Sequence, residues 1–176
     1  MTRIKRLLGS AMALLIAGCQ STMPPMPTVA SVDLKRFMGD WYVIASIPTF
    51  IEKGAHNAVE SYRLDDDGSV ATTFTFRAGG FDGEPKRYTP RGRVLDRQSN
   101  ALWGMTFIWP IEAEYRIAYL SEDYSQTVIA RTKRDFVWIM ARKPVIPDAD
   151  YERLLRLVGE LGYDTGKVIK VPQQWQ

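Results

Sequence analysis

The chain is poor in the residues that most often build catalytic and metal centres. Its 176 residues include one cysteine, Cys19, and one histidine, His56. A single cysteine excludes an internal disulfide, and with one histidine it also excludes the Cys- and His-rich sites that bind zinc or iron–sulfur clusters. The sequence also lacks a Gly-X-Ser-X-Gly elbow and a phosphate-binding glycine loop. We therefore expect no metal, no cofactor and no catalytic residue, and hence a binding protein rather than an enzyme.

The chain also lacks an excess of charge of either sign in its main body. The formal net charge is +3, and the basic residues Arg3, Lys5 and Arg6 near the N-terminus account for all of it. Nucleic-acid binding requires a clustered basic face, so nucleic acid is not an expected partner. With 45% hydrophobic and 24% charged residues, the composition is that of one globular domain with a single core.

No hydrophobic run is long enough to cross a membrane as a helix. After a basic start, the apolar run at residues 7–16 has ten residues, too few for a hydrocarbon core about 30 Å thick. Such a run is typical of a secretory signal peptide, which we assign to residues 1–18.

The signal ends in Leu15-Ile16-Ala17-Gly18-Cys19, which resembles the bacterial lipobox. The resemblance implies that Cys19 becomes the lipid-modified first residue of the mature chain. Acyl chains such as palmitate contribute about 0.8 kcal/mol per buried CH₂ group, so the resulting anchor would be firm. Gln20, in place of Asp, implies export to the outer membrane in the lipoproteins that this motif resembles. The alternative is a plain signal peptide with an incidental cysteine.

A proline-rich segment follows the expected lipidation site. Pro24, Pro25 and Pro27 lie among small and polar residues, a composition typical of an extended tether. We assign the tether to residues 19–31 and the folded domain to residues 32–176.

The domain is dominated by strand patterns separated by turn signals, and it shows no helical period before residue 148. Polar turns such as residues 65–68 and 96–100 favour hairpins between consecutive strands. Consecutive hairpins without crossover helices predict an all-β, eight-stranded, up-and-down antiparallel barrel, which has no free sheet edge. The predicted strands are residues 41–48, 58–64, 70–77, 87–95, 101–109, 115–120, 127–132 and 136–142.

This topology predicts a contact between residues far apart in the sequence. The first strand starts, and the eighth strand ends, at the same end of the barrel, and closure makes the two strands neighbours. Trp41 and Arg142 should therefore meet in a cation–π contact worth about 1 to 2 kcal/mol when partly desolvated.

These residues and their spacing resemble the lipocalin family. Gly39-Asp40-Trp41 matches the family's Gly-X-Trp, and Arg142 matches the arginine that packs across that tryptophan. Glu122-Asp123-Tyr124 lies where the family has Thr-Asp-Tyr, with Glu in place of Thr. With the lipobox, the chain looks most like the bacterial outer-membrane lipoprotein lipocalins. The resemblance implies a structural role for Gly39, Trp41, Asp123, Tyr124 and Arg142.

One helix is predicted after the barrel, at residues 148–161, with Asp148 as its N-cap and Gly162 after its end. Its apolar residues recur at helical spacing on one face: Tyr151, Leu154, Leu155, Val158 and Leu161. The seventh and eighth strands are apolar on both faces, so we expect the helix to pack on them outside the barrel. A short strand is expected at residues 168–171.

Alternation from Trp41 and Arg142 predicts which side chains point into the barrel. They are aromatic and Met-rich, which suits an elongated apolar ligand, although they could instead only fill the core. The inward set is Val43, Ala45, Phe74, Phe76, Trp103, Met105, Phe107, Tyr115, Ile117, Tyr119, Trp138 and Met140. Our candidate ligand-binding residues are Phe74, Met105, Phe107, Tyr115, Trp138 and Met140; the resemblance places Met105, Phe107, Tyr115 and Trp138 on pocket-lining positions of the family.

The loops at the open end of the barrel carry six basic and six acidic residues, including Glu52. Their net charge therefore favours neither an anionic nor a cationic head group on a ligand. They also carry apolar residues that either contact a membrane or fold over the mouth: Phe50, Ile51, Phe81, Trp109 and Ile111. His56 lies on one of these loops.

These observations predict a carrier anchored by Cys19 to the outer membrane and facing the periplasm. Its expected ligand is a fatty acid or lysophospholipid, for lipid storage, transport or repair in the cell envelope. One alternative is an enzyme that acts on a bound lipid, with His56 as the residue to test. Another is a ligand-free scaffold, whose interior would have no cavity large enough for an acyl chain. The sequence leaves the oligomeric state open.

Overall fold

The computed structural model describes residues 24–175, so the predicted signal peptide, Cys19 and the first part of the expected tether lie outside the described residues. The elements are α1 (Leu34–Phe37), β1 (Gly39–Ile47), β2 (Ala55–Leu64), β3 (Ser69–Ala78), β4 (Glu84–Tyr88), β5 (Arg91–Val94), β6 (Leu102–Ile108), β7 (Ile111–Leu120), β8 (Gln126–Ala130), β9 (Val137–Ala141), α2 (Asp148–Glu160), a 3₁₀ turn (Thr165–Lys167) and β10 (Ile169–Lys170).

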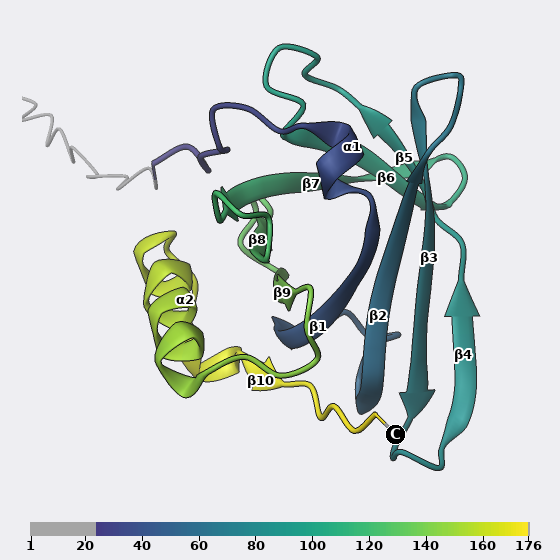
Figure 1. The fold of residues 1–176 in the computed structure, drawn as a ribbon, viewed down its shortest axis with the longest axis vertical. Coiled ribbons are helices and arrows are strands. Elements are labelled where there is room, and N and C mark those ends of the chain that lie inside the picture. Colours follow the sequence, from purple (N-terminus) through teal and green to yellow (C-terminus); the bar gives the residue numbers. More distant parts are fainter. Residues whose placement is uncertain (1–23, 176) are drawn as a thin grey trace, which may run out of the picture.

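The strands form one antiparallel sheet that closes on itself, as the hairpin pattern predicts (Figure 1). Consecutive strands pair from β1 to β3 and from β5 to β9, β3 also pairs with β5, and β1 also pairs with β9, which closes the sheet. The predicted fourth strand is interrupted at Thr89 and Pro90, giving β4 and β5, which both pair with β3. Proline cannot donate a ladder hydrogen bond, which explains the interruption. The eight-stranded up-and-down barrel is therefore confirmed.

A short helix that the sequence analysis missed covers one end of the barrel. Asp33 caps α1, because its Oδ1 accepts hydrogen bonds from the backbone N–H groups of Lys35 and Arg36, at 2.9 and 3.2 Å. Phe37 is fully buried and packs on Trp41, with ring centroids 4.9 Å apart. Four residues are too few to show a helical period, so only the capping signal was present in the sequence.

The predicted contact between Trp41 and Arg142 is present at this closed end. The guanidinium carbon of Arg142 lies 3.9 Å from the centroid of the Trp41 ring. Gly39 has φ +91°, and a Cβ there would lie 3.5 Å from Arg142 Nη1, so a residue without a side chain suits this position. The same guanidinium donates hydrogen bonds to the carbonyl oxygens of Arg36, Phe37, Met38 and Asp40, at 2.8 to 3.0 Å.

The turn after β7 holds α1 from the other side. The carboxylate of Asp123 accepts hydrogen bonds from Ser121 and Ser125, and these bonds lower its pKa to about 2. Tyr124 has φ +62°, and its hydroxyl accepts a hydrogen bond from the Asp33 N–H at 2.8 Å. The turn and α1 are thus joined at the cap residue of the helix.

Two bulges overturn part of the predicted inward set. The register shifts between Val43 and Ala45 in β1 and between Ile117 and Tyr119 in β7. A single extra residue moves the following side chains to the opposite face. Ala45 and Tyr119 therefore pack outside the barrel, in the cluster that contains α2, and Arg153 of α2 donates to the Tyr119 hydroxyl at 3.0 Å. Their predicted inward orientation was wrong.

Helix α2 packs on the outside of the barrel, as predicted (Figure 1). Tyr151, Leu154 and Val158 are buried against β8 and β9. Asp148 is the first helical residue rather than the N-cap, a position that Pro147 occupies without a side-chain bond. Strand β10 pairs with β1. Among residues 24–175, neither helix has the length and apolar character needed to cross a membrane.

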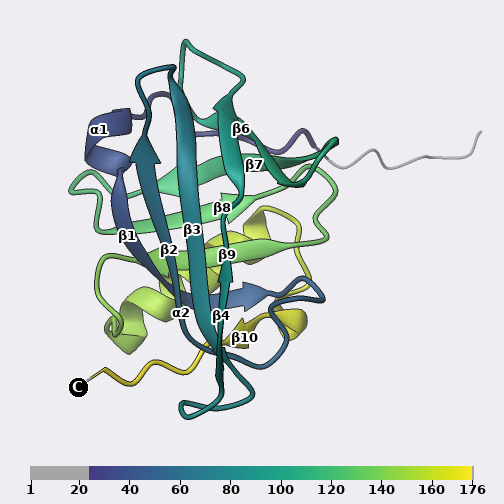
Figure 2. The same ribbon diagram turned by 90° about the vertical axis from the view of Figure 1, so that its right-hand side faces the viewer.

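The described part of the expected tether, residues 24–31, lies along the barrel instead of extending away from it (Figure 2). The Val29 N–H donates to the Ile117 carbonyl at 2.9 Å, and Met26 is only 3% exposed. The carbonyl of Pro24 accepts a hydrogen bond from Arg134 in the β8–β9 loop, at 2.7 Å. Burial of Met26 in the outer cluster explains the attachment, because it removes apolar surface from water. We name residues 24–31 the N-terminal strip.

We predict that Arg142→Lys lowers the free energy of unfolding by about 2 to 3 kcal/mol, because an ammonium group cannot stack on the indole and also reach four carbonyls. Urea unfolding monitored by circular dichroism measures the change. Arg63→Lys is the control, since that side chain is 74% exposed and should change stability by less than about 0.5 kcal/mol. Equal losses in the two variants would contradict the role assigned to Arg142.

Candidate ligand-binding site

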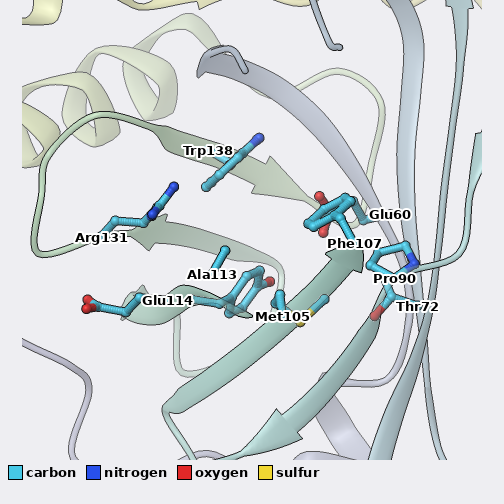
Figure 3. A pocket seen from close by; sticks show the side chains of 10 residues that line it. Glu60, Thr72, Pro90, Met105, Phe107, Ala113, Glu114, Arg131 and Trp138 are labelled. Carbon is cyan, nitrogen blue, oxygen red and sulfur yellow. The ribbon is translucent and has the colours of Figure 1, made fainter. Parts of the chain in front are cut away.

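The barrel contains an interior cavity of about 60 Å³, bounded by side chains from five of its strands, from the β4–β5 link and from the β8–β9 loop (Figure 3). Most of its lining is apolar or aromatic. The lining residues are Glu60, Thr72, Pro90, Met105, Phe107, Ala113, Glu114, Tyr115, Arg131 and Trp138.

The structure brings four of the six candidate ligand-binding residues to this cavity: Met105, Phe107, Tyr115 and Trp138. Phe74 and Met140 do not line it, but both are buried in the interior core. Phe107 is 47% exposed, so it lies between the cavity and solvent. The other inward residues that kept their predicted orientation, Val43, Phe76, Trp103 and Ile117, fill the core.

The cavity is small for a lipid. A cavity needs a volume of about 10 to 15 Å³ to hold one water molecule, so a cavity of 60 Å³ holds only a few waters. An acyl chain can enter only if lining side chains move. Met105 has a flexible, unbranched side chain and Phe107 is half-exposed, so these two residues have the most freedom to make room.

The cavity contains a buried carboxyl group that the sequence analysis did not identify. Glu60 is buried, and Oε2 of its side chain accepts a hydrogen bond from the Tyr62 hydroxyl. The hydroxyls of Tyr62 and Tyr115 lie 2.7 Å apart. Burial, and secondarily the charge of Glu52, raise the pKa of Glu60 to about 8. Burial also raises the pKa of Tyr115.

The alternation of β2 contains the signal for this residue. Glu60 pairs with Trp41 across β1 and β2, and paired residues share a face of the sheet. Trp41 points into the barrel, so its cross-strand partner on β2, Glu60, should point inward as well. The two-residue spacing between Glu60 and the buried Tyr62 gives the same result.

A second carboxylate fixes the orientation of Trp138. Glu52, expected as a charge on the rim, is buried instead. Its Oε1 accepts a hydrogen bond from the Trp138 indole N–H at 3.0 Å, and its Oε2 accepts one from the Thr49 N–H at 2.7 Å. The indole is therefore held against the cavity by the β1–β2 loop.

Two charged residues lie at the opposite side of the cavity from Glu60. The guanidinium of Arg131 points toward Trp138, whereas the carboxylate of Glu114 points away (Figure 3). Arg131 forms an ion pair with Asp135 at 3.5 Å, and Glu114 bonds to Arg116 and Thr132. Both groups thus have partners within the protein.

The sole histidine is not part of the cavity. His56 lies in a surface groove between the β1–β2 loop and β10, with Nδ1 3.0 Å from the Gly54 carbonyl oxygen. Its ring meets Phe81 edge-on at 5.0 Å. Among residues 24–175, no three His, Cys, Asp or Glu side chains are arranged to bind a metal ion.

Comparison with known proteins agrees with this geometry. Residues 32–173 match the family model described as a lipocalin-like domain. The chain is 28% identical to outer membrane lipoprotein Blc of Escherichia coli K12, over 92% of each chain. It is also 28% identical to temperature-induced lipocalin-1 of Arabidopsis thaliana, over 84% of this chain and 83% of that one. The fold is similar to that of insecticyanin from the tobacco hornworm, with a TM-score of 0.68 and 15% identity over 88% and 87% of the two chains.

We predict that Glu60 makes the protein less stable as the pH rises. Its pKa is about 8 in the folded protein and 4.5 ordinarily, so between these values the unfolded chain releases a proton that the folded protein keeps. The free energy of unfolding should fall by about 1 kcal/mol per pH unit in this window. Glu60→Gln should remove this contribution. Urea unfolding of both proteins from pH 5 to pH 8 tests it, and a constant difference between them would contradict it.

Proposed function

Because the chain belongs to the lipocalin family, we propose that it binds a hydrophobic small molecule inside its barrel and carries it in the cell envelope. The observation that carries this proposal is the interior cavity lined by Met105, Phe107, Tyr115 and Trp138. The ligand class we propose is a fatty acid or lysophospholipid, and the role is storage, transport or repair of envelope lipids.

The proposed location is the outer membrane, with the domain facing the periplasm and Cys19 as the acylated residue. The lipobox-like sequence before Cys19 supports this location. So does the similarity to proteins that are themselves named outer membrane lipoproteins.

The N-terminal strip supports an orientation of the barrel with its mouth toward the membrane. The strip runs along β7, and at Pro24 it reaches Arg134 in the β8–β9 loop, at the open end. Cys19 precedes Pro24 by five residues, which span at most about 17 Å when extended. A lipid on Cys19 would therefore hold the open end of the barrel close to the bilayer surface.

Apolar side chains at the same end support contact with the bilayer. Phe50, Trp109 and Ile111 are 83%, 85% and 70% exposed, and we name these three residues the apolar rim. Exposed aromatic and aliphatic groups beside a cavity are typical of membrane-contact surfaces. Ile51 is only partly exposed, and Phe81 packs on His56, so neither is included in the apolar rim. A lipid could pass between the bilayer and the barrel without crossing water.

The geometry argues against one of the two alternatives, the enzyme. His56 lies outside the barrel cavity. It therefore could not act on a lipid that is bound inside the barrel. The small volume of the cavity is what the scaffold alternative predicts, so a direct binding measurement must separate scaffold from carrier.

We predict that fatty acids or lysophospholipids quench the tryptophan fluorescence of the protein saturably. Trp138 lines the cavity and should report the ligand, so Trp138→Phe should abolish most of the quenching. The titration uses residues 20–176, which retain the whole described structure. A folded protein without response to either lipid class would contradict the carrier proposal and favour the scaffold.

We predict that Trp109→Ser weakens binding to phosphatidylethanolamine–phosphatidylglycerol vesicles about tenfold, because it removes the most exposed group of the apolar rim. Co-sedimentation of residues 20–176 with the vesicles measures this change. Trp175→Ser is the matched control, since Trp175 is 49% exposed and packs on Tyr42 away from the rim. Equal effects of the two substitutions would argue against a membrane-facing mouth.

A further inference from the structure

The buried carboxyl of Glu60 lies at the deep end of the cavity, next to the residues that close the barrel. Across the sheet, Glu60 pairs with Trp41 of β1 on one side and with Phe74 of β3 on the other, and both partners are buried in the interior core. Trp41 is the residue on which Arg142 closes the barrel. A ligand that enters through the mouth therefore meets Glu60 with its leading end.

The surroundings of this carboxyl contain acids and hydroxyls but no basic group. On β2 and β7 it faces Tyr62 and Tyr115, and from the β1–β2 loop it senses Glu52. None of the ion pairs among residues 24–175 includes Glu60 or Glu52. The one cationic side chain on the cavity wall, Arg131, belongs to the open end and pairs with Asp135. Residues 24–175 thus provide no counter-ion for Glu60.

A buried carboxyl without a counter-ion either stays protonated or takes a cation from outside. A carboxylate at the leading end of a ligand would find no opposite charge beside Glu60 and would be repelled by the charge of Glu52. An ammonium group would instead gain a charge-assisted hydrogen bond to Glu60. The hydroxyls of Tyr62 and Tyr115 lie beside that site, and the aromatic faces around the cavity also favour a cation.

We infer that the deep end of the cavity binds the amine group of a hydrophobic amine, with Glu60 as its counter-ion and the apolar tail toward the mouth. This inference rests on the proposed function, since it assumes that the cavity takes a hydrophobic ligand. It adds the chemical class of the polar group and the direction in which the ligand lies.

Binding of this kind must release a proton at neutral pH. The free protein holds a protonated Glu60, and the amine arrives as ammonium, so the carboxyl proton passes to solvent as the ion pair forms. Below the pKa of Glu60, the affinity for the amine should therefore rise about tenfold per pH unit. A neutral alcohol of the same length should show no such rise, and a carboxylate should bind more weakly as Glu60 ionises.

The experiment compares three ligands with the same twelve-carbon tail, dodecylamine, dodecanol and dodecanoate, by calorimetric titration of residues 20–176 at pH 6 and pH 7. We expect dodecylamine to bind at least tenfold more tightly than dodecanoate at pH 7 and to release about one proton, measured in buffers of different ionisation enthalpy. Glu60→Gln should weaken dodecylamine at least tenfold and change dodecanol less than about threefold. Glu112→Gln is the control, because it makes the same Glu-to-Gln change at a carboxylate that pairs with Arg93 outside the cavity.

The outcomes separate this inference from the proposed function. If dodecanol or dodecanoate binds as tightly as dodecylamine, and Glu60→Gln affects all three ligands equally, the amine site is wrong while the carrier proposal stands. If none of the three binds to protein whose fold is verified by circular dichroism, both are overturned. Equal losses of dodecylamine affinity in Glu60→Gln and Glu112→Gln would also reject Glu60 as the counter-ion.

Discussion

The guanidinium of Arg142 is the interaction on which the rest of the structure depends. It stacks on Trp41, and it donates to carbonyls of α1 and of the residues that lead into β1. These bonds join the end of β9 to the start of β1, the two strands that close the barrel. They also hold α1 across the barrel end, where Phe37 fills the space above Trp41. One planar group with several donors thus closes the sheet and seals its end, which a flexible ammonium could not do.

A sealed end has a direct consequence for the cavity. A ligand that entered the barrel would come from the open end, so the polar groups at the closed end would meet only its leading part. Glu60 lies there with two tyrosine hydroxyls and, among residues 24–175, no counter-ion, in an interior that is otherwise aromatic and Met-rich. A buried carboxyl with a raised pKa is expected to disfavour the folded state at higher pH, and residues that reduce stability without a structural benefit are typical of functional sites. Glu52 has a different role, because its bond to Trp138 couples the β1–β2 loop to the cavity wall.

The two ends of the barrel differ, and the difference is the one that the proposed membrane-facing carrier would require. The closed end is held by backbone hydrogen bonds and tightly packed rings, whereas the open end exposes Phe50, Trp109 and Ile111. The N-terminal strip connects the two ends along β7 and leaves the barrel at the mouth. If the N-terminal strip ended at the closed end instead, the mouth of the cavity would lie on the far side of the domain from a lipid anchor on the N-terminal segment. The attachment of the strip, through Met26 and Val29, therefore bears directly on how a ligand could reach the cavity.

The sequence by itself determined the architecture, because alternation, turn residues and helical spacing are local signals that persist along each element. They were sufficient for the antiparallel barrel, the contact between Trp41 and Arg142, and the helix α2 packed outside. They were not sufficient for Ala45 and Tyr119, since each follows a bulge whose position depends on the neighbouring strand. The size of the cavity, the isolation of Glu60 and the burial of Glu52 were decided only by the tertiary structure. Each of these depends on which side chains from distant strands fill the shared interior, and no single stretch of sequence contains that information.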